Sequence, residues 1–143
     1  MITLALLKQM VADNVANLEI DKNCFWEQAP LQKDGKPAQG VWLVTRGAVL
    51  TSGGNGKGLN LRSTVDFYVA LANKPKTEEV HQKILEWILT NKCFCELVGS
   101  VGGVNYSFSN IRVRPTTTPQ NTVVTENNLV VKLASAEVIY DIK

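Results

Sequence analysis

Apolar and polar side chains alternate along residues 59–72, which read LNLRSTVDFYVALA. One parity holds the apolar residues Leu59, Leu61, Val65, Phe67, Val69 and Leu71. The other parity holds Asn60, Arg62, Thr64, Asp66 and Tyr68. Successive side chains of a strand point to opposite faces of a sheet, so this pattern predicts a half-buried strand of an antiparallel sheet that has one wet face.

Two further segments have helical spacing. Between Ile2 and Leu18, apolar residues recur every three or four positions, which predicts an amphipathic N-terminal helix. A second helix is predicted to begin at Thr77, as its N-terminal cap, and to finish near Asn91. Its buried stripe would consist of Val80, Ile84, Trp87 and Ile88. Its water-facing side would carry His81, Gln82, Lys83 and Glu86.

Four other segments have strand character. Val41–Thr51 is apolar on both parities, which is typical of a central strand covered on both faces. Cys93–Val98 predicts a short strand, and Tyr106–Arg114 predicts another, with a bulge near residues 109–110 where the parity of its apolar residues shifts. Residues 129–142 predict one bent strand or two short ones.

Together these elements predict one α+β domain over residues 1–143, with a mixed or antiparallel β-sheet flanked on one face by two α-helices. The order is helix, strands, helix, strands. A chain of 143 residues is long enough to bury a core of its own. No apolar run has the length of a membrane-spanning helix, so we expect a soluble protein that does not engage a membrane.

Charge and cysteine content narrow the setting. Fifteen basic and thirteen acidic residues give a net charge of +2, which is too near balance for a nucleic-acid footprint over a whole face. The three cysteines are an odd count, and no basic and then apolar leader opens the chain. We therefore expect synthesis in a reducing, intracellular compartment and no disulfide framework.

A glycine-rich loop separates the strand predicted at residues 41–51 from the strand predicted at residues 59–72. It comprises Ser52, Gly53, Gly54, Asn55, Gly56, Lys57 and Gly58. A phosphate-binding motif would need glycine at position 51 and Ser or Thr at position 58, and the element that follows would have to be a helix instead of a strand. We therefore interpret this loop as a segment that contacts a partner. A second segment of similar character, Pro115–Asn121, has no assigned role.

The cysteines and the single histidine do not form a strong metal motif. Cys93 and Cys95 share a strand face, and with Cys24 and His81 they would complete a set of four zinc ligands. Their spacing lacks the paired C-x-x-C pattern, so we interpret Cys93 and Cys95 as buried strand thiols. The carboxylates are scattered, and we predict no enzymatic activity, no cofactor and no metal.

Arginines form a candidate basic stripe. Arg112 and Arg114 share a parity, and Arg46 and Arg62 would lie on neighbouring strands. Such a stripe would suit phosphates or an acidic protein surface, but alternating arginines also occur on solvated strands that contact nothing. Any contact with DNA here would be independent of base sequence.

Three stretches of the chain together resemble the tail-terminator, or tail-completion, proteins of long-tailed bacteriophages. The first is the N-terminal amphipathic helix. The second is CFWEQAPLQKDGKPAQGVWLVTR, residues 24–46, with Phe25, Trp26, Ala29 and Pro30 in an aromatic-x-x-Ala-Pro arrangement. The third is RSTVDFYVALANKPKTEEVHQKILEWILTN, residues 62–91, a strand of alternating aromatics followed by a helix with early acidic residues.

The resemblance implies a structural virion protein at the head–tail junction, without catalysis or cofactor. It implies a homo-oligomeric ring, as a hexamer, that caps the tail tube, stops its polymerisation and presents a docking surface to the head–tail connector protein. Carried onto this sequence, it makes Ser52–Gly58 a candidate contact with the tail-tube protein or the connector. It makes Arg62, Asp66 and Tyr68 candidates for subunit contacts.

Three alternatives remain open on the residues alone. One is another head–tail joining or tail-tube protein. Another is a small enzyme or ligand-binding domain with a pocket between sheet and helices. The last is a nucleic-acid-binding protein that contacts the backbone, whose affinity would fall steeply as salt rises.

Overall fold

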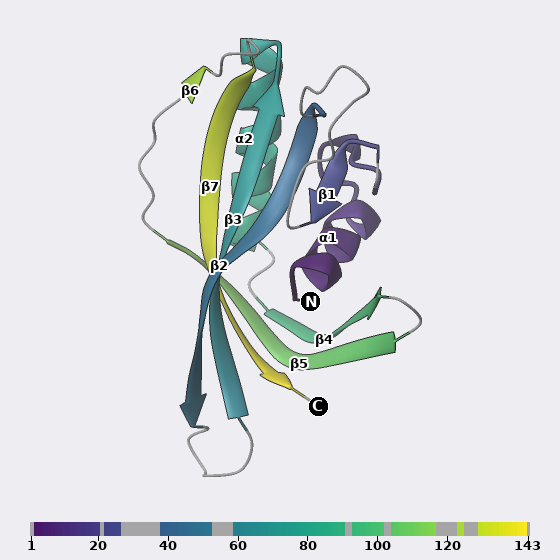
Figure 1. The fold of residues 1–143 in the computed structure, drawn as a ribbon, viewed down its shortest axis with the longest axis vertical. Coiled ribbons are helices and arrows are strands. Elements are labelled where there is room, and N and C mark those ends of the chain that lie inside the picture. The colour runs from purple at the N-terminus through teal and green to yellow at the C-terminus, as the bar shows by residue number, and fades with distance from the viewer. Residues whose placement is uncertain are drawn as a thin grey trace.

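A computed structural model describes residues 2–20, 22–26, 38–52, 59–90, 93–101, 104–116, 123–124 and 129–142. Its elements, in chain order, are α1 (Ile2–Ala12), a 3₁₀ turn (Val15–Asn17), β1 (Cys24–Trp26), β2 (Gly40–Ser52), β3 (Leu59–Leu71), α2 (Lys74–Thr90), β4 (Cys93–Val101), β5 (Val104–Pro115), β6 (Val123–Val124) and β7 (Val130–Ile142). Figure 1 shows their arrangement.

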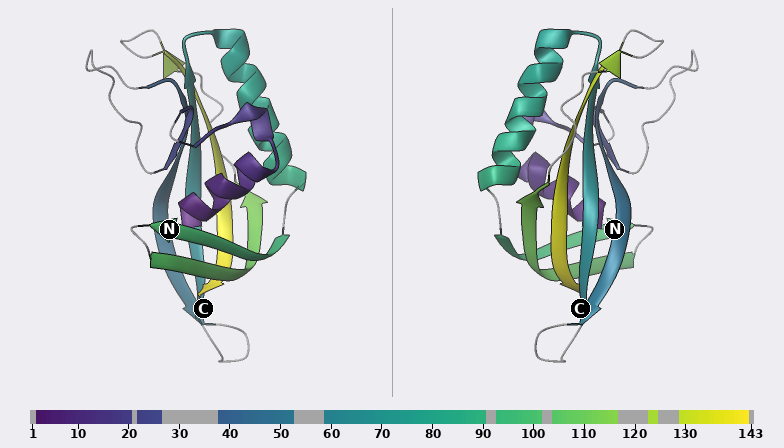
Figure 2. Two further views of the ribbon diagram at one scale, coloured as in Figure 1. Left: turned by 90° about the vertical axis from the view of Figure 1, so that its right-hand side faces the viewer. Right: turned by 90° about the vertical axis from the view of Figure 1, so that its left-hand side faces the viewer.

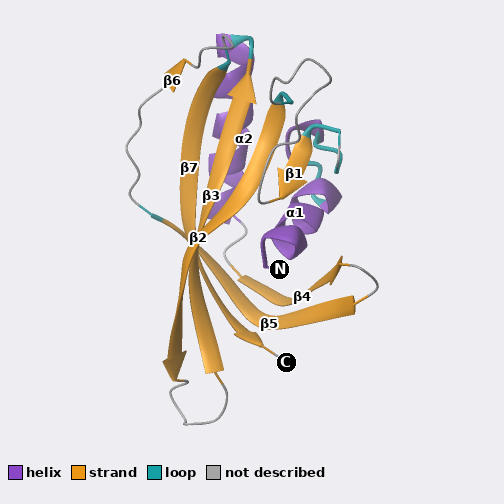
Figure 3. Ribbon diagram, in the orientation of Figure 1, coloured by secondary structure: helices purple, strands orange, loops and turns teal. Residues whose placement is uncertain are grey.

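The strands form one mixed sheet in the order β1-β2-β3-β7-β5-β4, and β6 pairs with β7. Among the named strands of the described ranges, β1 and β2 pair in parallel and the other pairings are antiparallel. Both helices lie on the same face of the sheet (Figure 2; Figure 3). The predicted fold class, an α+β domain with two helices on one face of a mixed sheet, is therefore confirmed.

The alternation along β3 separates the two faces of the sheet as predicted. Val65, Phe67 and Val69 are fully buried under the helices. Their partners on β2 and β7 include Leu43 and Ala134, which are also fully buried. Because cross-strand partners point to the same side, one apolar layer extends over the three central strands and forms the floor of the core.

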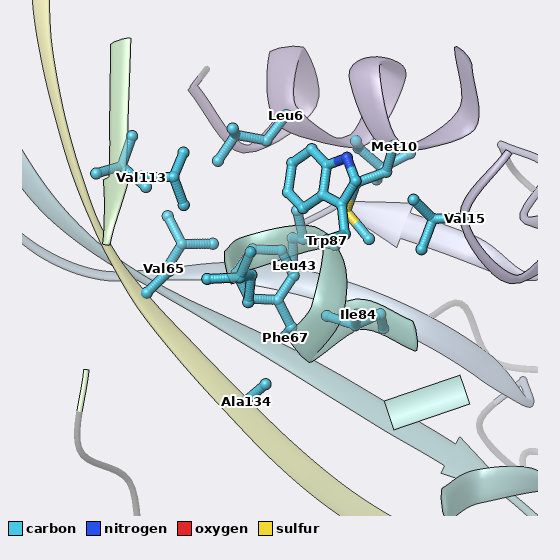
Figure 4. Packing of buried hydrophobic residues seen from close by; sticks show 14 of the residues in the cluster. Leu6, Met10, Val15, Leu43, Val65, Phe67, Ile84, Trp87, Val113 and Ala134 are labelled. Atoms are coloured by element: carbon cyan, nitrogen blue, oxygen red, sulfur yellow. The ribbon is translucent and has the colours of Figure 1, made fainter. Parts of the chain in front are cut away.

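The two helices cover that layer. Ile84, Ile88 and Trp87 of α2 pack into the core together with Leu6 and Met10 of α1 (Figure 4). The Trp87 indole N–H donates a hydrogen bond of 2.9 Å to Asp13 Oδ2, just after α1 ends. This bond satisfies the one polar atom of a nearly buried indole and connects the two helices.

The structure corrects the predicted N-terminal helix in two respects. The helix ends at Ala12 and not at Leu18, because Asn14, Ala16 and Asn17 all have positive φ, which no helix interior accepts. Its N-terminal half is buried on nearly every side, with residues 2–7 all buried, instead of along one stripe. The β4–β5 hairpin bends beneath α1 and packs against it (Figure 2), so the helix has sheet on more than one side.

The start of α2 is also corrected. Asn73, and not Thr77, is the N-terminal cap, because its side-chain Oδ1 accepts a 3.0 Å hydrogen bond from the Lys76 backbone N–H. Thr77 lies one turn further in and is fully buried. Its hydroxyl donates to the backbone oxygen of Asn73 at 2.9 Å.

Local backbone features fix the strands. The bulge predicted near Ser109 and Asn110 is confirmed, because the β5–β7 register shifts between Ser109 and Arg112 and Asn110 has φ of 53°. A short strand, β1, pairs in parallel with β2. Gly40 permits its approach, because a Cβ at Gly40 would lie 2.3 Å from the Asn23 carbonyl oxygen. Residues 129–142 contain one continuous strand, β7.

The central apolar layer should dominate stability. Phe67→Ala is expected to lower the free energy of unfolding by about 3–5 kcal/mol, because it removes a fully buried ring from the middle of the core. Leu89→Ala on exposed α2 surface is the control and should change it by less than about 0.5 kcal/mol. Urea unfolding followed by circular dichroism measures both, and equal effects would contradict this assignment of the core.

Candidate functional site

The face of the sheet that points away from both helices carries an unusual mixture of arginine and aromatic side chains. We call it the outer face. The register assigns to it Trp42, Val44, Arg62, Thr64, Asp66, Tyr68, Arg112, Arg114, Val131, Leu133, Ser135, Glu137, Ile139 and Asp141, and Arg46 joins them through its bond to Asp66. No described helix covers this face (Figure 2).

An aromatic pair lies towards one end of the outer face. Trp42 and Tyr68 are direct cross-strand partners, and their rings stack with centroids 5.6 Å apart and planes inclined by 15°. Both side chains are half-buried, as are Val44 and Leu133 beside them. Over residues 41–44, the strand predicted at residues 41–51 is therefore covered on its inner face, by the core around Leu43, but only partly covered on its outer face.

A buried carboxylate lies next to the aromatic pair. Asp66 is 2% exposed, and its two oxygens accept hydrogen bonds from Ser135 Oγ at 2.5 Å and from Arg46 Nε at 2.9 Å. A charge at that depth is tolerated only when it is paired and hydrogen-bonded. Asp66, a candidate for subunit contacts, bonds within its own sheet and holds the Arg46 guanidinium, whose side chain is 59% exposed, over the outer face.

The arginines of the predicted basic stripe lie on the outer face. Arg62 and Arg112 lie on either side of Ile139 across three strands, and Arg114 is the register partner of Glu137. Arg62 Nε lies 3.4 Å from Glu137 Oε1, with the Arg62 side chain 50% exposed. Arg112 and Arg114 are both exposed and have no ion pair with any other described residue.

His81 is not on the water-facing side of its helix, as the sequence predicted. It is 4% exposed, and its Nε2 lies 3.1 Å from the Leu133 backbone oxygen, so α2 bonds to β7 through this ring. Burial lowers the pKa of His81 below its ordinary value of 6.5; the hydrogen bond to Leu133 opposes this shift, and the nearby charge of Lys132 adds to it.

The cysteines have different surroundings from the histidine. Cys24 is fully buried, and burial raises the pKa of its thiol to about 12, so it is an inert core residue. Cys93 is exposed, which corrects the prediction that it is buried, and the side chain of Cys95 lies outside the described residues. Among the described residues, no three or more His, Cys, Asp or Glu side chains gather as a metal site.

Other predicted site residues lie partly outside the described part of the chain. Ser52 is the last residue of β2, at the end of the molecule away from α2 (Figure 1), whereas residues 53–58 of the glycine-rich loop are not described. Pro115 ends β5, and residues 117–121 of the second such segment are likewise not described. The helices in the described ranges are too short or too polar to cross a membrane.

One surface pocket of the described part of the chain, of about 340 Å³, lies between the 3₁₀ turn and α2 and is lined by residues that include Val15 and Trp87. Others lie around Arg112. One of about 470 Å³ is lined by Cys93, Arg112, Val113, Arg114 and Pro115. Another, of about 240 Å³, is lined by Asn110, Arg112, Ile139 and Asp141. Sequence reasoning missed Trp42 and Ser135 as partners on the outer face, and it placed Arg46 near the basic stripe without its bond to Asp66. Only the strand register brings these residues beside Tyr68 and Asp66.

No protein-family model matches the sequence, and no curated protein matches it significantly. The arrangement on the outer face therefore has to be interpreted from its own chemistry. Aromatic and arginine side chains are the residue types that most often dominate binding energy at protein interfaces.

The buried carboxylate should matter more for folding than the exposed ion pair. Asp66→Ala is expected to lower the free energy of unfolding by about 1–3 kcal/mol, because it leaves the buried Ser135 hydroxyl without its acceptor. Arg62→Ala, which breaks a half-exposed pair on the same face, should cost less than about 1 kcal/mol. Equal costs in urea titrations would contradict the assigned network.

His81 should make stability depend on pH. A His with a lowered pKa in the folded protein stays neutral there, so its stabilising contribution is complete above the unfolded-state value of about 6.5. As pH falls below that value, the unfolded chain binds a proton first and stability declines until the lowered folded-state pKa is reached.

The measurement is urea unfolding at pH 7.5 and pH 5.5 of the native protein and of His81→Gln. The native protein should lose stability between the two pH values, and the variant should lose less. An identical loss in both proteins would show that another group is responsible.

Proposed function

We propose that this protein is a structural subunit of a bacteriophage tail terminator. Six copies would close into a ring on the end of the tail tube, stop its polymerisation and present a docking surface to the head–tail connector protein. The mechanism is steric. Head-to-tail contacts that close by rotation leave no free interface at which another subunit could add, and no covalent bond is made or broken. The protein would be made in the host cytoplasm and end in the virion, at the head–tail junction.

The observation that carries the proposal is the strand-to-helix unit of residues 62–91. Its resemblance to terminators rests on a strand of alternating aromatics that runs directly into a helix with early acidic residues. Here β3 carries Phe67 and Tyr68 on opposite faces and ends at Leu71, and α2 begins at Lys74 with Glu78 and Glu79 in its second turn. The N-terminal helix and the strand that begins at Gly40 are the other two elements that the resemblance expects.

The partners follow from the same proposal. They are other copies of the chain, the tail-tube protein and the connector, with Ser52–Gly58 as a contact to one of the latter two. Arg62 and Tyr68 remain candidates for subunit contacts because both reach the outer face, whereas Asp66 would act by holding Arg46 in place. Contacts with DNA passing through the ring would be independent of base sequence.

The first test is the mass of the purified protein, measured by light scattering alone and with tail-tube subunits. The expected result is a closed ring, about six times the subunit mass of 15.7 kDa, in at least one condition. A monomer that ignores tubes would overturn the proposal. Deleting the gene separates a terminator, whose loss gives overlong tails, from a connector, whose loss leaves normal but unattached tails.

A further inference from the structure

The exposed side of α2 divides into two rows of different character. Lys76, Glu79 and Lys83 form one row, in which the two lysine Nζ atoms lie 3.9 and 3.3 Å from the Glu79 carboxylate. The other row, which we call the acidic stripe, consists of Glu78, Gln82, Leu85, Glu86 and Leu89. These residues are spaced three or four apart and so lie along one side of the helix.

The acidic stripe combines unpaired carboxylates with apolar surface. Glu78 and Glu86 have no ion pair with any other described residue, although Glu86 accepts a 3.4 Å hydrogen bond from Gln82 Nε2. Leu89 is 52% exposed, the one large hydrophobic side chain in the described ranges that is so open to solvent. Lys74 begins the same row, one turn before Glu78 and away from the leucines.

The outer face of the sheet has the opposite charge and lies on the opposite side of the molecule. α2 packs on the inner face (Figure 2), and no residue of the stripe is among the buried residues of this helix. On the outer face, Arg112 and Arg114 are exposed and unpaired within the described chain, and Arg46 remains 59% exposed despite its bond to Asp66. The three carboxylates of this face, on Asp66, Glu137 and Asp141, are already bonded to neighbours in the sheet.

We propose that the acidic stripe of one copy docks on the outer face of the next copy. This proposal names the two surfaces that would meet in the ring of the proposed function. It rests on that function for the number of copies. Leu85 and Leu89 would lie against the Trp42–Tyr68 pair, with Glu86 beside them meeting Arg46. Glu78, at the other end of the stripe, would meet Arg112 and Arg114. Each contact joins charges of opposite sign and covers apolar surface on both partners.

The dimensions of the two surfaces agree. From Leu89 to Glu78 the helix rises about 16 Å, at ~1.5 Å per residue. From the row of Tyr68 to the row of Arg62 the sheet spans about 20 Å, at ~3.3 Å per residue. The leucines can therefore contact the aromatic pair while Glu78 reaches the arginine rows.

Charge also selects the geometry of the assembly. A symmetric dimer through the outer face would place the arginines of one copy against those of the other, which is unfavourable. A contact between two different surfaces leaves both of them free at the ends of any open chain of subunits. Such an assembly continues until it closes as a ring or grows as a filament.

The test uses two double variants of the full chain. Arg112→Glu/Arg114→Glu reverses the outer face, and Glu78→Lys/Glu86→Lys reverses the stripe. Each alone should weaken self-association on the order of tenfold or more in sedimentation velocity, with an unchanged circular dichroism spectrum. Mixed in equal amounts, the two variants should assemble again. In a contact between unlike variants, either both surfaces are native or both carry the reversed charges.

Glu79→Lys is the matched control, since it changes the same charge on the same helix but in the other row. It should leave assembly unchanged. If both double variants assemble like the native protein, the interface proposed here is wrong and the ring uses another surface. If the mixture fails to assemble although each variant is folded, the pairing of these two surfaces is also wrong.

The remaining outcomes separate this inference from the proposed function. A native protein that stays monomeric with and without tail tubes overturns both. A second outcome is that the native protein binds a thymidine oligonucleotide, that Arg112→Glu/Arg114→Glu loses this binding, and that this variant self-associates like the native protein. That outcome would assign the outer face to nucleic acid and overturn the docking proposal alone.

Discussion

The pairing of β3 with β2 on one side and with β7 on the other is the constraint on which the rest of the structure depends. These pairings fix every side chain of β3 to one face or the other, because the side-chain period of a strand is two residues. The inner set, centred on Phe67, supplies the floor on which both helices pack. The outer set, centred on Asp66 and Tyr68, supplies the candidate interaction surface. A shift of one residue would exchange the two sets.

The helices are held to this floor by polar bonds as well as by apolar contact. The Trp87 indole bonds to Asp13, and the His81 ring and the Thr77 hydroxyl reach backbone oxygens on neighbouring elements. Each bond satisfies a polar atom that burial would otherwise leave without water. They also fix the orientation of α2 about its own axis, so the stripe with Leu89 faces away from the sheet.

Hydrogen bonds and ring stacking hold several side chains of the outer face in fixed positions. Asp66 is buried and accepts hydrogen bonds from two donors, which holds the Arg46 guanidinium over the outer face. The Trp42 and Tyr68 rings stack towards one end of the outer face, and each ring limits the rotamers of the other. A surface whose anchors are held in place before a partner arrives loses little conformational entropy on binding.

The sequence by itself determined the fold class, the alternation of β3, the buried stripe of α2 and the bulge near Asn110, because each depends on local periodicity that survives without knowledge of neighbours. Tertiary structure alone decided the burial of Asp66 and His81 and the exposure of Cys93. The reason is that burial depends on which strands and helices become adjacent. Ser135 is 69 residues from Asp66, and Leu133 is 52 from His81, so no local pattern could reveal either bond.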